Sequence, residues 1–189
     1  MRRIFAAIEV NPEPALLHLL SEAGSRFSRE RIRWVRPEQM HLTLKFFGET
    51  PEEKIGEICS RFEGVAVMHH PFSCTLQGLG LFGSRYAPRV VWAGIRDDAP
   101  LRQLGEDVLD ASSEAGFPRE RLPFVPHLTL GRIAAVQNKK GLSDWISAYR
   151  DTTFQVLRVN RFILFESKLK STGALYTEIC TFLLPSQSG

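Results

Sequence analysis

Apolar and polar residues alternate along several short stretches of the chain, and this period of two is typical of β-strands with one buried face. The alternation predicts strands at residues 3–10, 32–35, 72–81, 90–95, 154–164 and 176–184. Two more strands begin at His41 and His127, and we expect the first to run to about Phe47 and to end at Gly48. Several of the connections suit hairpins better than crossovers, which favours antiparallel pairing.

Apolar residues at helical spacing separate these strands at four places. The first helix follows Pro12, and the second follows Thr50-Pro51-Glu52-Glu53, which has the form of a capping box. The third begins near Asp98, and a short fourth helix is capped by Ser143, after a turn at residues 139–141. The inward positions of the first three helices are Leu16, Leu20, Ala23 and Phe27, then Ile55, Ile58 and Phe62, then Leu101, Leu104, Val108 and Ala111.

Strand pairs that alternate with helices predict an α+β fold, in which antiparallel sheets carry helices on their outer face. A chain of 189 residues is most simply one domain, and we expect a single bilobal domain over residues 1–189. Hydrophobic residues make up 43% of the chain, which is ordinary for a globule with a substantial core. No apolar run approaches the roughly 18 residues of a membrane helix, so we expect no membrane partner.

The three cysteines, Cys59, Cys74 and Cys180, are scattered and form no CxxC motif. We expect them to be buried thiols in a reducing compartment. The N-terminal residues make a poor signal peptide, which together with the cysteines predicts a cytoplasmic protein. The net charge of +3 permits an anionic substrate without predicting one, although four arginines cluster just before His41: Arg29, Arg31, Arg33 and Arg36.

One tetrapeptide occurs twice, as residues 41–44 and again, 86 positions later, as residues 127–130. Both copies read His-Leu-Thr-Leu. On a strand, alternation places His41 and Thr43 on one face, and likewise His127 and Thr129. The duplication predicts two pseudo-symmetric halves, each of which offers one imidazole and one hydroxyl to a shared cleft.

The duplicated motif and its flanks, His-Leu-Thr-Leu-Lys-Phe-Phe-Gly-Glu at 41–49 and Pro-His-Leu-Thr-Leu-Gly-Arg at 126–132, resemble the 2H phosphoesterase superfamily. Within it, the chain most resembles the RNA 2′,3′-cyclic phosphodiesterases, also called 2′–5′ RNA ligases, over essentially its whole length. The resemblance implies two lobes of antiparallel sheet with outer helices and a central cleft that carries both motifs.

Two histidines on one cleft suit a reaction that needs an acid and a base together, since imidazole titrates near neutrality. A cyclic phosphodiester is such a substrate. Thr43 and Thr129 can donate to the phosphoryl oxygens, and Arg132 is a candidate bidentate phosphate ligand. The residues alone leave open which histidine is the acid. The resemblance implies that His41 is the proton donor and His127 the proton acceptor.

Two further residues fall on the face of His41 if the strand is ideal. Phe47 would stack on a nucleobase, or else be a core phenylalanine. Lys45 would add positive potential near the phosphate, or else be a solvated surface lysine. Arg33 and Arg36 would follow an RNA backbone, or else be ordinary exposed arginines.

We therefore expect a monomeric enzyme that hydrolyses RNA 2′,3′-cyclic phosphate ends to 2′-phosphomonoesters, with no cofactor and no metal. The partner is RNA with such an end, or a small cyclic nucleotide. Two alternatives stay open: 2′–5′ ligation or hydrolysis of another cyclic nucleotide by the same chemistry, and an RNA-end-binding module without turnover. Intact motif histidines and threonines argue against the binding module. Two-histidine catalysis predicts a bell-shaped dependence of kcat/KM on pH around neutrality.

Overall fold

Leu42 and Leu128 pair at the centre of an antiparallel sheet, where the two motif strands meet. This is seen in a computed structural model that describes residues 1–84, 86–119, 123–170 and 173–186. Within those residues the sheet has nine strands, in the order β7-β4-β5-β6-β3-β1-β8-β9, with β2 paired to β6. The strands are β1 (Arg2–Glu9), β2 (Arg31–Trp34), β3 (His41–Thr50), β4 (Phe72–Gly83), β5 (Pro88–Arg96), β6 (His127–Ala135), β7 (Thr153–Val159), β8 (Arg161–Lys170) and β9 (Gly173–Leu183).

The sheet divides into two halves that repeat the same arrangement about the central leucine pair. Each half has four strands in a row, β3-β1-β8-β9 on one side and β6-β5-β4-β7 on the other. All their pairings are antiparallel. The expected α+β fold with two pseudo-symmetric halves is confirmed, and the duplicated tetrapeptide begins the innermost strand of each half.

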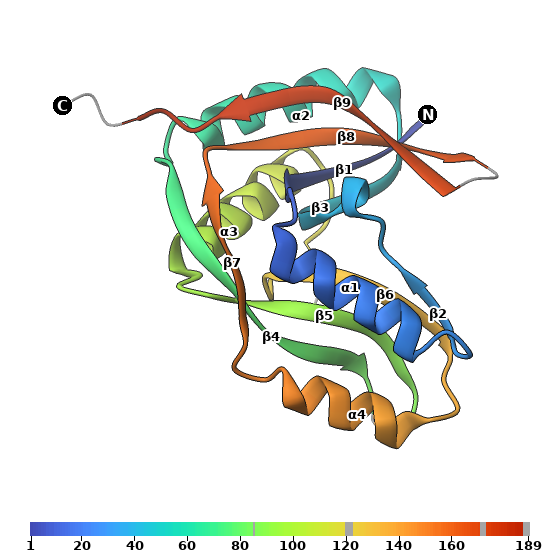
Figure 1. Cartoon of the computed structure of the whole chain (residues 1–189). Coiled ribbons are helices and arrows are strands. Elements are labelled where there is room, and N and C mark those ends of the chain that lie inside the picture. The colour runs from blue at the N-terminus through green and yellow to red at the C-terminus, as the bar shows by residue number, and fades with distance from the viewer. Residues whose placement is uncertain (85, 120–122, 171–172, 187–189) are drawn as a thin grey trace.

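Helices cover both halves of the sheet (Figure 1). In the half that contains β3, α2 (Glu52–Ala66) packs on β9 and α3 (Ala99–Glu114) packs on β3. In the other half, α1 (Pro14–Arg26) contacts β7 and α4 (Lys139–Ala148) contacts β4. The helical stripes expected from the sequence point inward, because their apolar side chains belong to the main hydrophobic core. No helix in the described ranges is both long enough and apolar enough to span a bilayer.

Four local expectations about where strands and helices begin and end are wrong. Strand β3 continues through Gly48, at φ +74°, to Thr50. The hydroxyl of Thr50 donates to the Gly48 carbonyl instead of capping α2, so the capping box does not form. Helix α4 begins at Lys139, with the Asn138 side chain as its cap. The stretch 154–164 is not one strand, since β7 and β8 separate at Asn160.

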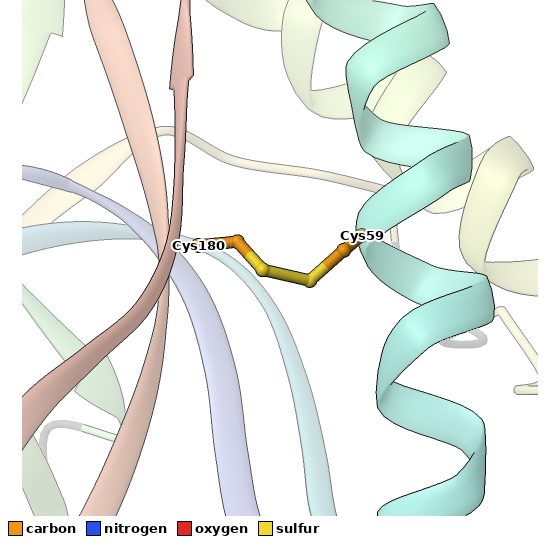
Figure 2. The surroundings of a disulfide bond; sticks show 2 residues. All are labelled: Cys59 and Cys180. Carbon is orange, nitrogen blue, oxygen red and sulfur yellow. A yellow bond between two sulfur atoms is a disulfide. The ribbon is translucent and has the colours of Figure 1, made fainter.

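Two of the three cysteines are joined. Cys59 of α2 and Cys180 of β9 form a disulfide across 121 positions of sequence (Figure 2). The expectation of three free thiols is therefore wrong for this pair, because the fold places the helix and the edge strand side by side, which scattered sequence positions do not reveal. Cys74 is a free, buried thiol, as expected, and burial raises its pKa to about 11.

Candidate active site

The central leucine pair sets the positions of the two histidines. In an antiparallel ladder, the pairing of Leu42 with Leu128 places His41 next to Thr129 and Thr43 next to His127. All four side chains then share the face opposite the buried leucines, and we call this the histidine face. Diagonal neighbours across a ladder lie about 7–8 Å apart. The two imidazoles are therefore diagonal neighbours on this face. The threonine hydroxyl directly opposite each imidazole belongs to the other motif.

Both imidazoles are held in the same way. Nδ1 of His41 lies 2.8 Å from the carbonyl oxygen of Gln39, and Nδ1 of His127 lies 2.8 Å from that of Val125. A carbonyl oxygen can only accept, so Nδ1 must carry the proton in each ring. Nε2 is then the nitrogen that gains or loses a proton. This fixed tautomer suits proton transfer at a single defined atom.

Burial and charge act on the two histidines in the same direction. Burial lowers the pKa of His41, and the Arg132 guanidinium lowers it further, while the bond to the Gln39 carbonyl opposes both. The pKa of His127 is also lowered, mainly by burial and then by Arg132, against the bond to the Val125 carbonyl. In the free protein both rings are therefore more often neutral near pH 7 than an exposed histidine would be.

Arg132 lies where its charge reaches both imidazoles. It also acts on Tyr176, whose pKa is raised by burial and lowered by the charges of Arg132 and Arg3. Arg132 itself is exposed. An exposed guanidinium whose charge acts on two imidazoles is well placed to bind an anion that contacts both of them.

Aromatic rings that the sequence reasoning missed surround the two histidines. Phe5 and Tyr176 contact the His41 ring, with centroid distances of 4.9 and 5.3 Å. Phe82 meets the His127 ring edge-on at 4.7 Å and also contacts Trp92. Alternation in β1 could have placed Phe5 opposite the core residues of that strand. The others depend on strand register, which no local pattern reveals.

Each motif strand contains a β-bulge at its fourth residue, and the bulge interrupts the alternation of side chains between the two faces. Ala7 pairs with Thr43 and Ala6 with Lys45, so Leu44 is an extra residue in β3. In β6, Trp92 pairs with Thr129 and Val91 with Gly131, so Leu130 is the equivalent extra residue. The first seven residues of the two strands accordingly share one burial pattern. Directly beyond the bulge, side chains lie on the face opposite to the one that simple alternation predicts. In β3 a second register shift follows, because Phe5 pairs with Phe46 and Ile4 with Gly48.

The bulge moves Lys45 and Phe47 away from the histidine face, and the expectation that they share it is wrong. Lys45 pairs with the core residue Ala6, is buried, and donates from Nζ to the Pro118 carbonyl at 2.8 Å. Phe47 packs into the main core against Phe62 and Phe117.

Phe46 takes the place on the histidine face that was expected for Phe47. It pairs with Phe5, contacts that ring at 5.6 Å, and is 50% exposed. By position in the duplicated strand, Phe46 is the counterpart of Arg132, since each is the sixth residue of its motif strand. The same bulge therefore brings an aromatic ring to the site from one half and a guanidinium from the other.

The side chains at the site favour acid–base chemistry on an anion. Neither threonine hydroxyl makes a hydrogen bond with another group in the described ranges, so both can donate to a ligand. Across those same ranges, no cluster of three or more His, Cys, Asp or Glu side chains could hold a metal ion.

The sequence model of the LigT-like phosphoesterases matches this chain in two segments, residues 8–92 and 94–176. Each segment contains one His-x-Thr-x motif. The chain belongs to the LigT-like phosphoesterase family, within the 2H superfamily.

Relatives from bacteria and archaea support this membership. An RNA 2′,3′-cyclic phosphodiesterase of Archaeoglobus fulgidus is 31% identical over 186 residues, which covers 95% of this chain and 99% of that protein. One from Geobacillus stearothermophilus is 43% identical over 117 residues, which covers 59% of this chain but only 37% of the relative. The match to the archaeal phosphodiesterase thus extends over nearly the full length of both chains.

Solved structures share the fold of this LigT-like phosphoesterase. The protein TT0787 of Thermus thermophilus superposes with a TM-score of 0.76 at 29% identity, covering 98% of this chain and 99% of that one. E. coli LigT complexed with 3′-AMP superposes with a TM-score of 0.73 at 26% identity, covering 97% and 98%.

Proposed function

We propose that this protein hydrolyses RNA 2′,3′-cyclic phosphate ends to 2′-phosphomonoesters by two-histidine acid–base catalysis. The observation that carries the proposal is the matched pair of imidazoles, each fixed at Nδ1 by a backbone carbonyl and each paired across the ladder with a threonine of the other motif. The curated relatives named RNA 2′,3′-cyclic phosphodiesterase add support from outside the chain.

In the proposed reaction, neutral His127 accepts a proton from water at Nε2 while the water oxygen attacks phosphorus. The bond from phosphorus to O3′ breaks, and protonated His41 gives its Nε2 proton to the leaving O3′. The product carries a 2′-phosphate and a 3′-hydroxyl. His127 ends protonated and His41 neutral, and exchange with solvent restores both. Each such proton transfer typically contributes on the order of 10²–10⁴ in rate.

The remaining residues would hold the phosphate while charge develops on it. Arg132, whose charge acts on both imidazoles, would bind the phosphoryl oxygens, and Thr43 and Thr129 would donate to them from either side. Phe46, on the same face, would contact the terminal base or ribose. No step of this chemistry requires a metal ion.

A short RNA with a 2′,3′-cyclic phosphate end, incubated with the protein and EDTA, tests the proposal. Chromatography that separates the 2′- from the 3′-phosphate product should show the 2′-phosphate alone. The 3′-phosphate as product would reverse the leaving group, and loss of activity with EDTA would contradict the metal-independent mechanism. Absence of turnover would favour the alternative of an RNA-end-binding module.

Variants of the two histidines separate catalysis from binding. His41→Ala and His127→Ala should each reduce kcat by at least about 100-fold, since each removes one proton transfer. Both should still bind the cyclic end, because Arg132 and the threonines remain. Single-turnover kinetics and fluorescence anisotropy on the same RNA measure the two properties. Turnover within a few-fold of wild type in either variant would remove that histidine from the mechanism.

The same site also suits ligation, in which a ribose 5′-hydroxyl replaces water as the nucleophile and a 2′–5′ bond forms. A supplied 5′-hydroxyl RNA, with products analysed for a 2′–5′ linkage, measures the balance between the two reactions.

We also propose that residues 1–189 act as a single bilobal domain, as a monomer, in the cytoplasm. Both histidines, both threonines and Arg132 come from one chain, so one copy supplies every proposed group. A disulfide is uncommon in cytoplasmic proteins. Alkylation of the protein directly in lysed cells, followed by mass spectrometry of Cys59 and Cys180, would show whether the bond exists where the protein works.

A further inference from the structure

Strand β2 places two arginines beside the proposed phosphate ligand. Arg33 pairs directly with Arg132 in the antiparallel ladder between β2 and β6. Directly opposed residues project from the same face of a sheet, so Arg33 stands on the histidine face next to Arg132. Arg31 lies two residues back along β2 and alternates to the same face, about 6.6 Å from Arg33. All three arginines are exposed.

The other face of β2 fixes the strand in this orientation. Ile32 and Trp34 pack against the main core. The Trp34 ring lies so close to Gly131 that a Cβ at that position would come within 2.8 Å of it. With its apolar residues anchored in this way, β2 must direct Arg31 and Arg33 outward.

Nothing in the described part of the chain neutralises this arginine row, which consists of Arg31, Arg33 and Arg132. None of the three forms an ion pair there, whereas Arg36 pairs with Glu38 at 3.7 Å. Like charges placed directly opposite each other on a sheet are destabilising. The row therefore favours an anionic ligand that carries more than one charge.

We propose that Arg33 and Arg31 bind the phosphodiesters that precede the cyclic end, so that oligonucleotide RNA is preferred over 2′,3′-cyclic mononucleotides. This inference rests on the proposed function. When the cyclic phosphate occupies the site at Arg132, the rest of an RNA chain leaves through the 5′ oxygen of the terminal ribose. The arginine row continues outward from Arg132 and offers successive guanidinium groups, which bind phosphates in bidentate fashion.

The kinetic test compares adenosine 2′,3′-cyclic phosphate with a tetranucleotide that ends in the same nucleotide. The wild-type protein should have a higher kcat/KM for the tetranucleotide. Arg33→Ala should lower that value by about tenfold, the typical effect of one charged hydrogen-bonded contact, and leave the mononucleotide unchanged. Arg33→Lys should retain part of the preference, since it keeps the charge but loses the planar fork.

Arg158 supplies the matched control. It is also exposed, but lies on β7, with β4 and β5 between it and β6. Arg158→Ala should leave kcat/KM unchanged for both the mononucleotide and the tetranucleotide. A second readout is the salt dependence of tetranucleotide binding, measured by anisotropy with the His127→Ala protein to prevent turnover. Adding Arg33→Ala should reduce the slope of log Kd against log salt by about 0.7, as expected for one lost phosphate contact to a single strand.

Two results would overturn the inference. One is a wild-type protein that hydrolyses both substrates with equal kcat/KM. The other is an equal loss on both substrates in Arg33→Ala, which would mean that Arg33 supports the fold or the chemistry itself. If the wild type cleaves neither substrate, it is the proposed function that fails. The salt slope then decides the arginine assignment, and an unchanged slope rejects it.

Discussion

At the scale of single residues, Nδ1 of each imidazole donates a hydrogen bond to a backbone carbonyl, so Nε2 is the nitrogen that can exchange a proton with a ligand. The ring environment then sets the working pH. Burial against Phe5 and Tyr176 on one side, and near Phe82 on the other, disfavours the charged form of both rings. A bound phosphate anion would favour the charged form again, so substrate itself would help to protonate the acid.

The lowered histidine pKa values predict the pH at which kcat/KM is highest. The base must be neutral, which requires a pH above its pKa, and the acid must be protonated, which requires a pH below its own. The bell of kcat/KM is centred midway between the two values. Because both lie below 6.5, we expect the centre below pH 6.5, which is more acidic than the sequence alone suggested. Initial rates at low substrate concentration measure this profile.

Arg132 provides the control for that profile. Its positive charge lowers both histidine pKa values, so Arg132→Ala should move the bell toward higher pH as well as weaken binding of substrate. Arg132→Lys retains the charge and should leave the centre in place. A wild-type bell centred at neutrality or above would contradict the effect of burial on these rings.

At the scale of elements, the shared bulge decides which side chains the two motif strands present. Leu44 and Leu130 are each the extra residue, and the strand faces exchange after them. Extra residues of this kind are frequent next to active sites, where they redirect a side chain. Here the bulge turns Phe46 and Arg132 toward the histidines and Lys45 into the protein.

Replacing Phe47 by alanine should therefore affect stability, whereas replacing Phe46 should affect substrate binding. Phe47→Ala should destabilise the protein by about 3–5 kcal/mol, because it removes a ring packed against Phe62 and Phe117, with little change in KM. Phe46→Ala should raise KM for RNA, with a change in unfolding free energy of less than about 1 kcal/mol, because that ring is half exposed. Urea denaturation and steady-state kinetics of both variants measure the contrast, and the reverse pattern would place Phe47 at the substrate.

The bulge also marks where sequence reasoning stops being reliable. Up to Thr43 and Thr129, simple alternation gives the correct faces, and the duplicated motif leads directly to the paired histidines. One residue later, an insertion that leaves no sequence signal reverses the parity, so Phe47 is chosen in place of Phe46. Tyr176 and Phe82 were missed for a related reason, since they reach the histidines from other strands, and register between distant strands is a tertiary property.

At the scale of the whole molecule, the disulfide ties an edge strand to a helix. Strand β9 pairs only with β8 within the described ranges, and Cys180 fastens it to Cys59 of α2. The same strand carries Tyr176, which touches His41. The bond thus links the covering helix to the strand that completes one side of the site.

Reduction of this bond should weaken the fold measurably. A cross-link that closes 121 positions of sequence stabilises by about 5 kcal/mol in the chain-entropy account. Treatment with dithiothreitol should lower the urea midpoint accordingly. The Cys59→Ser/Cys180→Ser double variant should unfold at that lower midpoint with or without reductant. A wild-type midpoint that reductant does not change would mean that the bond contributes nothing to stability.

The two halves of the molecule are alike at the histidines and unlike at the sixth residue of each motif strand, and this gives the site a handedness. A cyclic phosphate ring offers two leaving oxygens, O2′ and O3′, that differ little in chemistry. A perfectly two-fold site would accept the ring in either sense and release a mixture of regioisomers. With an aromatic ring at Phe46 on one side and a guanidinium at Arg132 on the other, only one sense is complementary. Regioselectivity would then come from this pair of positions, at which the repeated strands present different side chains to the substrate.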